Sequence, residues 1–125
     1  MKIRKVRVGI KNLETALSEF IETGRYLEAG KPVKKEKSVY FTSVEAFRKA
    51  LTPRRLALLR AIKTEKPSSV RQLSKITERD IKNVSTDIKF LEQAGLVDIK
   101  KNTGTGKEVR PLVNYDRILF EIALA

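Results

Sequence analysis

The 125-residue sequence predicts a mainly α-helical fold with a small β component, an α+β class. Three observations indicate this class. Apolar residues recur at helical spacing between residues 43 and 94, alternating apolar segments lie at 3–10 and 117–125, and a basic hairpin with glycines follows the last predicted helix. A net charge of +12 adds a functional constraint, because a strongly basic domain favours polyanionic partners.

The helical pattern is clearest between residues 69 and 95. Ser69 is placed as an N-cap, and Gln72 completes a capping box for a helix from Val70 to Ile76. Thr77 ends this helix and is expected to cap a second one, around residues 78–94. The buried stripe of the second helix is formed by Ile81, Val84, Ile88 and Leu91. Gly95 stands at the C′ position, where the helix ends.

The opposite face of the second helix carries no acidic residue. At about 100° per residue, this outer face holds Arg79, Lys82, Asn83, Thr86, Lys89 and Gln93. Two helices joined by so short a turn cross steeply, as in a helix-turn-helix that places its second helix in the DNA major groove. Asn83 suits adenine and Lys82 suits guanine. The residues that we expect to read bases are Arg79, Lys82, Asn83, Thr86 and Lys89.

A basic hairpin completes this region. Strand-like residues 97–101 and 108–110 are joined through a tip in which Gly104 and Gly106 permit positive φ and a close approach to phosphate. Together with the two helices, the hairpin predicts a winged helix-turn-helix. The residues expected to bind phosphates are Arg71, Lys75, Lys100, Lys101, Lys107 and Arg110. The alternative for the hairpin alone is a solvated loop without a ligand.

The run TPRRLALLRAI…SVRQLSKITERDIKNVSTDIKFLEQAGLV resembles the MarR-like winged helix-turn-helix transcriptional regulators of archaea and bacteria. The resemblance covers Leu51 to about Val113 and includes the motif Asp80-Ile81-Lys82-Asn83-Val84. It implies a transcriptional regulator that binds double-stranded DNA. Two features depart from the pattern: Ser85 and Thr86 replace a frequent His or Arg, and Phe90 replaces a polar or small residue. Phe90 is expected either to pack under the hairpin or to meet a partner.

Residues 1–37 are predicted as a strand-helix extension and a linker. Val6, Val8 and Ile10 alternate with charged residues, as in a half-buried strand. Asn12 is expected to cap an apolar helix, and the charged segment 30–37, broken by Pro32, is typical of a linker.

The DNA-binding domain is expected to span 38–113. It begins with a short strand at 39–41 and a helix at 43–50, capped by Thr42 with Glu45. Thr52-Pro53 then starts a further helix, which buries Leu56, Leu59 and Ile62.

Residues 114–125 are predicted as a C-terminal strand that can support dimerisation. Its apolar face consists of Ile118, Phe120, Ile122 and Leu124. So apolar a strand needs a neighbour, and the strand at 3–10 is the natural one, either within one chain or across a dimer. We expect a homodimer, since one recognition helix reads only a few base pairs.

Composition excludes several function classes. The sequence has no Cys and no His, so it lacks disulfides, thiolate or imidazole metal ligands and histidine bases. We expect no enzyme, no cofactor and no metal, and a cytoplasmic location because neither a signal peptide nor an apolar spanning segment is evident. An RNA-binding winged helix would need exposed aromatic residues for stacking. The main alternative is an antitoxin-like module that binds a protein through its N-terminal segment and represses its own operon.

Overall fold

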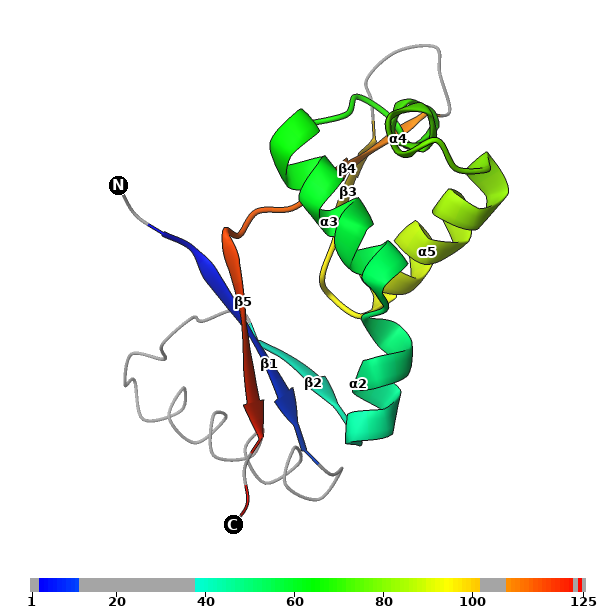
Figure 1. The fold of residues 1–125 in the computed structure, drawn as a ribbon. Coiled ribbons are helices and arrows are strands. Elements are labelled where there is room, and N and C mark those ends of the chain that lie inside the picture. Colours follow the sequence, from blue (N-terminus) through cyan, green and yellow to red (C-terminus); the bar gives the residue numbers. More distant parts are fainter. Residues whose placement is uncertain (1–2, 12–37, 102–107, 123, 125) are drawn as a thin grey trace. The chain divides into compact units, whose positions relative to one another are not determined.

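The structure, a computed structural model, describes residues 3–11, 38–101, 108–122 and 124. It is an α+β fold in which four helices and five strands occur within these ranges (Figure 1). The predicted helix after Asn12, the linker at 30–37 and the hairpin tip at 102–107, with Lys107, lie outside the described residues.

The chain divides into two compact units. We call residues 1–48 with 117–125 the sheet unit and residues 49–116 the helical unit. The boundary after Arg48 differs from the expected division at 37 and 113. Residues 38–41 and 117–122 belong to the sheet unit because both segments pair with the same central strand.

The sheet unit contains a parallel three-stranded sheet. Strand β1 (Lys5–Ile10) lies between β2 (Ser38–Phe41) and β5 (Arg117–Ile122). Val8 is opposite Val39 on one side and Phe120 on the other. The predicted alternation is confirmed, since Val6 and Val8 are fully buried. The pairing of β5 with β1 occurs within one chain.

Helix α2 (Val44–Ala50) brings an aromatic side chain to this sheet. The ring of Phe47 stacks on Phe120, with ring centroids 4.3 Å apart, and meets Phe41 edge-on at 5.7 Å. The expected cap was wrong by one residue, because the Ser43 hydroxyl, rather than Thr42, accepts a hydrogen bond from the Ala46 N–H. Ser43 is therefore the N-cap residue of α2, and its hydroxyl bonds the N–H three residues later, as is usual for an N-cap.

The helical unit contains α3 (Pro53–Glu65), α4 (Val70–Thr77) and α5 (Ile81–Gln93), followed by strands β3 (Asp98–Lys101) and β4 (Val109–Leu112), which pair antiparallel. Its buried apolar side chains include Ala50, Leu58, Leu59, Ile62, Leu73, Val84, Ile88, Leu91, Leu96, Val97 and Tyr115. Ile81, expected in the core, is 39% exposed because it lies in the first turn of α5, at the edge of the stripe.

Tyr115 anchors the segment after β4 to the core. Its buried hydroxyl donates a hydrogen bond to the Leu96 carbonyl oxygen at 2.8 Å. Burial raises the pKa of the Tyr115 hydroxyl above its ordinary value, and the negative charge of Asp98 raises it further. The phenol therefore stays a hydrogen-bond donor far into the alkaline range.

Side-chain caps define the helix ends. Thr52 caps α3 with Pro53 at the first helical position, as predicted. Ser69 accepts from the Gln72 N–H, also as predicted, but the Gln72 side chain accepts from the Ser68 N–H instead of returning to Ser69. Thr52 therefore fixes the start of α3, and Ser68 and Ser69 fix the start of α4.

Candidate nucleic-acid interface

The junction between α4 and α5 sets the direction of α5. α4 ends at Thr77, whose hydroxyl donates back to the Leu73 carbonyl. Glu78 adopts a left-handed conformation with φ 53°, and the Asp80 carboxylate accepts from the Lys82 N–H at 2.8 Å. The expectation that Thr77 caps α5 is therefore wrong. The Thr77 hydroxyl is used within α4, and the chain needs residues 78–80 to reverse direction.

Four of the five predicted base-reading residues are exposed on α5. They are Lys82, Asn83, Thr86 and Lys89. The Thr86 hydroxyl donates to the Lys82 carbonyl at 2.9 Å, which leaves its oxygen lone pairs to accept. Asp87 turns away from this face, with only 15% of its side chain exposed. The exposed face of α5 therefore presents two cations, an amide and a hydroxyl.

The fifth predicted base reader, Arg79, lies in a mostly buried ion cluster. Its Nη2 donates to Asp87 Oδ2 at 2.9 Å, and 20% of its side chain is exposed. The other carboxylate oxygen of Asp87 accepts from Arg55 Nε at 3.1 Å. Arg55 also donates through Nη1 to the carbonyls of Lys49 and Ala50, each at 3.0 Å. Asp87 thus connects α5 to α3 and to the link preceding α5, and sequence spacing gave no signal for this cluster.

Phe90 packs against a residue of the same cluster. The Arg55 guanidinium lies 4.0 Å over the centroid of the Phe90 ring, which is 36% exposed. This contact supplies a cation–π interaction between α3 and α5. This contact within the chain accounts for the aromatic residue at position 90.

The hairpin carries part of the predicted phosphate-binding set. Lys100 is opposite Arg110 and Lys101 is opposite Val109. Both lysines are exposed. Arg110 is half-buried, and its Nε has no hydrogen-bond partner within the described part of the chain. Lys100 and Lys101 are therefore more accessible to a ligand than Arg110.

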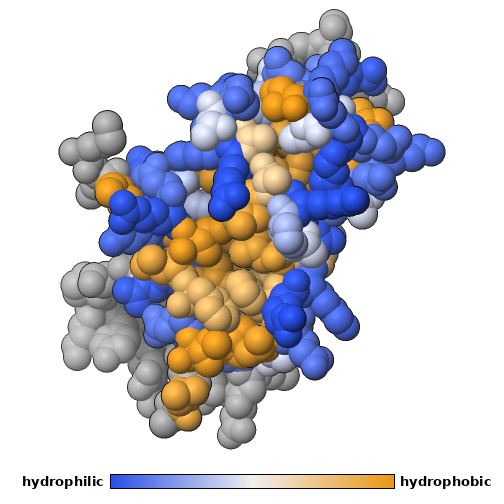
Figure 2. All heavy atoms as spheres, in the orientation of Figure 1, coloured by the Kyte–Doolittle hydropathy of each residue, from blue (hydrophilic) through white to orange (hydrophobic). Residues whose placement is uncertain are grey.

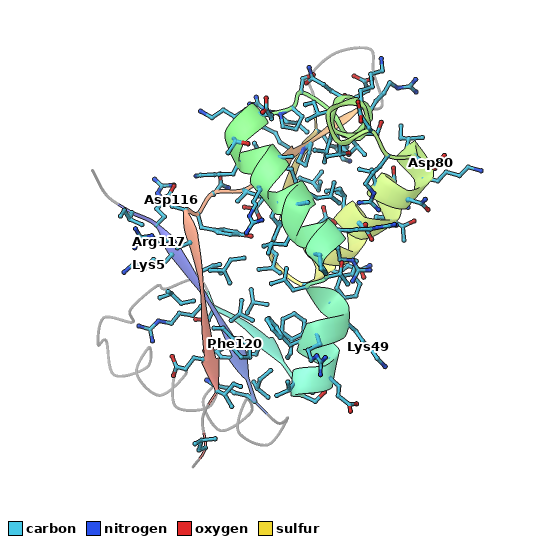
Figure 3. All side chains as sticks on the ribbon, in the orientation of Figure 1. Lys5, Lys49, Asp80, Asp116, Arg117 and Phe120 are labelled. Carbon is cyan, nitrogen blue, oxygen red and sulfur yellow. The ribbon has the colours of Figure 1, made fainter. Side chains whose placement is uncertain are left out.

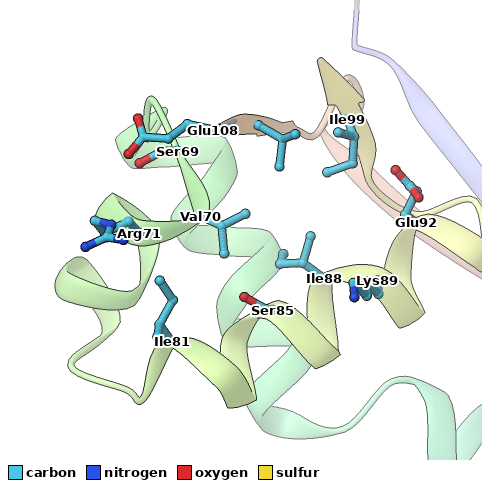
Figure 4. Close-up of a pocket in the computed structure, with 11 residues that line it drawn as sticks. Ser69, Val70, Arg71, Ile81, Ser85, Ile88, Lys89, Glu92, Ile99 and Glu108 are labelled. Atoms are coloured by element: carbon cyan, nitrogen blue, oxygen red, sulfur yellow. The ribbon is translucent and has the colours of Figure 1, made fainter. Parts of the chain in front are cut away.

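A groove of about 560 Å³ separates the hairpin from α4 and α5 (Figure 4). Its apolar lining consists of Val70, Ile81, Ile88, Ile99 and Val109. Arg71 and Lys89 line it together with Glu92 and Glu108, so the predicted ligand-binding cations Arg71 and Lys89 border the same depression. Lys75 is exposed on α4. Sequence periodicity did not predict the groove, because it assigned Ile81 to the core.

No helix within the described ranges has both the length and the apolar character needed to cross a bilayer. Among the same residues, no three His, Cys, Asp or Glu side chains gather as metal ligands would.

Comparison with known proteins gives one family. No curated protein matches the sequence. The model of the HVO_A0114 family matches residues 50–120, more than half of the chain, and this segment holds all of α3, α4, α5 and the hairpin. The protein is therefore a member of the HVO_A0114 family.

Proposed function

We propose that the protein is a transcriptional regulator that binds double-stranded DNA through a winged helix-turn-helix of the MarR-like group. In this assignment α4 and α5 form the helix-turn-helix, α5 is the recognition helix and β3–β4 is the wing. The observation that carries the proposal is the exposed side of α5 that presents Lys82, Asn83, Thr86 and Lys89. A face of this composition matches the donor and acceptor pattern of the major groove.

The proposal gives each exposed group a chemical role. The Asn83 amide has the geometry to bond adenine N6 and N7, and the Lys82 ammonium can donate to guanine O6 and N7. Thr86 and Lys89 extend the same face by one helical turn. Arg79 acts instead as a positioning residue, since its ion pair with Asp87 fixes the start of α5.

Phosphate contacts come from cations around this face. Arg71, Lys75, Lys100 and Lys101 are exposed in the structure. They carry no sequence information and set the affinity and the orientation of the protein on the duplex. The regulator acts as a homodimer, because a single recognition helix covers too few base pairs for a specific operator. Its proposed location is the cytoplasm.

The first test is the salt dependence of DNA affinity. With about five phosphate contacts, log K falls with log salt at a slope of roughly −4 to −5, because each contact releases a counterion. Fluorescence anisotropy with a duplex selected from a random-sequence pool measures the slope. An affinity that does not change with salt contradicts the proposal.

The second test separates base reading from phosphate binding. Asn83→Ala is expected to cost about 1–3 kcal/mol of binding free energy on the selected duplex and little on a scrambled one. Lys101→Ala is the matched control, since a phosphate contact weakens both duplexes equally. Identical effects of both variants on both duplexes would show that the outer face of α5 does not read bases.

A second candidate function, an antitoxin-like protein-binding module, has one observation in its favour. Phe120 and Ile122 on β5 are 43% and 44% exposed, and Leu124 is 97% exposed. Exposed apolar side chains of this size often mark a protein interface. Stoichiometric co-purification with the product of the adjacent gene would support this function, and it is compatible with DNA binding.

A further inference from the structure

Strand β5 has one edge without a strand partner in the described part of the chain. The Arg117 N–H donates to the Arg4 carbonyl, 3.3 Å away on the β1 side. Backbone groups of successive strand residues point to opposite edges. The N–H and C=O groups of Ile118, Phe120 and Ile122 therefore point away from β1, toward the open edge. Such an edge is a template for pairing with another chain.

The side chains on one face of β5 are apolar. Ile118, Phe120 and Ile122 lie on one face of the sheet, opposite Val6, Val8 and Ile10 in the register. Phe120 and Ile122 are each more than 40% exposed. Figure 2 shows apolar side chains gathered over β5, and Figure 3 shows Phe120 on this strand, with Lys5 beside Arg117 where β1 and β5 begin to pair. A strand added at this edge would place its own side chains beside these and bury their flanks.

We propose that β5 pairs antiparallel with β5 of a second copy of this chain, about a two-fold axis at Leu119. The two three-stranded sheets then form one continuous sheet. Ile118 lies opposite Phe120 of the second copy in hydrogen-bonded pairs, which use the backbone groups of the open edge. The interface is isologous, so each contact occurs twice.

Charge complementarity selects this register. Centring the axis on Leu119 places Arg117 opposite Glu121 of the second copy, twice, in non-hydrogen-bonded pairs where side chains approach most closely. An axis at Phe120 places Glu121 opposite Leu119, and an axis at Ile118 places Arg117 opposite Leu119. Neither alternative pairs opposite charges.

Glu121 has room for the additional cation. It forms an ion pair with Arg7 at 3.4 Å, in which the Arg7 and Glu121 side chains are 50% and 66% exposed. Arg117 is also exposed. A carboxylate with two oxygens can accept from both guanidinium groups, so the Arg7 contact does not compete with the proposed one.

The first experiment uses the absence of cysteine in the sequence. In Leu119→Cys the two thiols face each other across the axis at a separation close to that of a disulfide. Mild oxidation of the full-length variant is expected to give a covalent dimer on a non-reducing gel. Phe120→Cys is the register control, because its thiol faces Ile118. Efficient cross-linking of Phe120→Cys but not of Leu119→Cys would overturn the register.

The second experiment exchanges the charges. Arg117→Glu or Glu121→Arg alone is expected to raise the dimer dissociation constant about tenfold, since like charges then face each other twice. The double variant restores the opposite charges and the wild-type constant, and the circular dichroism spectrum checks that each variant is folded. A wild-type chain that sediments as a monomer at micromolar concentration would overturn the proposal.

The inference specifies the partner surface of the proposed regulator, yet its tests contain no DNA. A dimer with the predicted cross-link that does not bind DNA would contradict the proposed function alone. DNA binding by a monomer would contradict the β5 interface alone.

Discussion

The helical unit and the sheet unit are stabilised in different ways. In the helical unit, directed polar contacts connect separate helices: Asp87 binds Arg55 and Arg79, and all three side chains are mostly buried. In the sheet unit, the described Arg7–Glu121 ion pair is exposed, while backbone pairing and the Phe47 ring contacts join its elements. Buried polar networks fix one geometry, whereas an open apolar strand accepts further pairing.

The difference separates two tasks within one chain. The outer face of α5 needs a fixed orientation before a ligand arrives, because preorganised groups lose less freedom on binding. The β5 edge needs only a matching strand. The three predictions below test whether the polar contacts of the helical unit and the apolar contacts of the sheet unit differ in energy as this comparison requires.

The largest effect is expected for Asp87→Ala. Removing the carboxylate leaves two mostly buried guanidinium groups without their partner and should lower the free energy of unfolding by about 3 kcal/mol. Denaturant titration followed by circular dichroism measures this change. The control is Arg7→Ala in the sheet unit, which removes the exposed Arg7–Glu121 ion pair and leaves Glu121 for the proposed dimer contact; an exposed pair contributes less than about 1 kcal/mol. Equal effects of the two variants would remove the distinction between the units.

Tyr115→Phe is expected to cost about 1–2 kcal/mol at neutral pH, because the Leu96 carbonyl loses a buried donor. The raised pKa of Tyr115 predicts a pH dependence with a definite sign. Above about pH 10 the unfolded chain releases the phenol proton and the folded chain retains it, so stability falls as pH rises.

Denaturant titrations from about two pH units below to about one pH unit above the ordinary tyrosine pKa of roughly 10 compare the two proteins. The wild-type protein should lose its advantage over Tyr115→Phe at the alkaline end. A constant difference at every pH would contradict the role assigned to the buried hydroxyl.

The smallest effect concerns the aromatic contacts of the sheet unit. Phe47→Leu keeps an apolar side chain but loses the ring contacts with both Phe41 and Phe120, and the edge-on contact with Phe41 is worth about 0.5–1.5 kcal/mol. A double-mutant cycle with Phe41→Leu isolates the coupling between the two rings. Additive effects would show that burial alone, without ring geometry, stabilises this contact.

Local features of the fold were predictable from sequence. The Thr52 and Ser69 caps, the alternation of β1 and the end of α5 before Gly95 each depend on residues within a few positions of one another. The caps assigned to Thr42 and Thr77 failed for a local reason. A neighbouring residue, Ser43 or Asp80, also accepts hydrogen bonds, and backbone geometry decides between them.

Side-chain contacts between residues far apart in the sequence were not predictable in the same way. Arg55 and Asp87 are 32 positions apart, and nothing in the spacing of charges distinguishes their pair from a solvated one. Helical periodicity placed Arg79 with Lys82 and Asn83, yet the turn before α5 directs its side chain toward Asp87. The pairing of β1 with β5 was expected from their apolar alternation, but their parallel direction and the place of β2 on the other side of β1 were not, because alternation shows only which face of each strand is buried.

The register of the sheet also has a consequence for synthesis on the ribosome. Lys5 pairs with Arg117, and the contiguous helical unit at 49–116 is translated between these two residues. Domains made from contiguous sequence generally fold as they emerge, at about 5–20 residues per second. One edge of β1 pairs with β2 soon after it is made, whereas the other edge waits several seconds for β5. Until then that edge is available to chaperones or to other nascent chains.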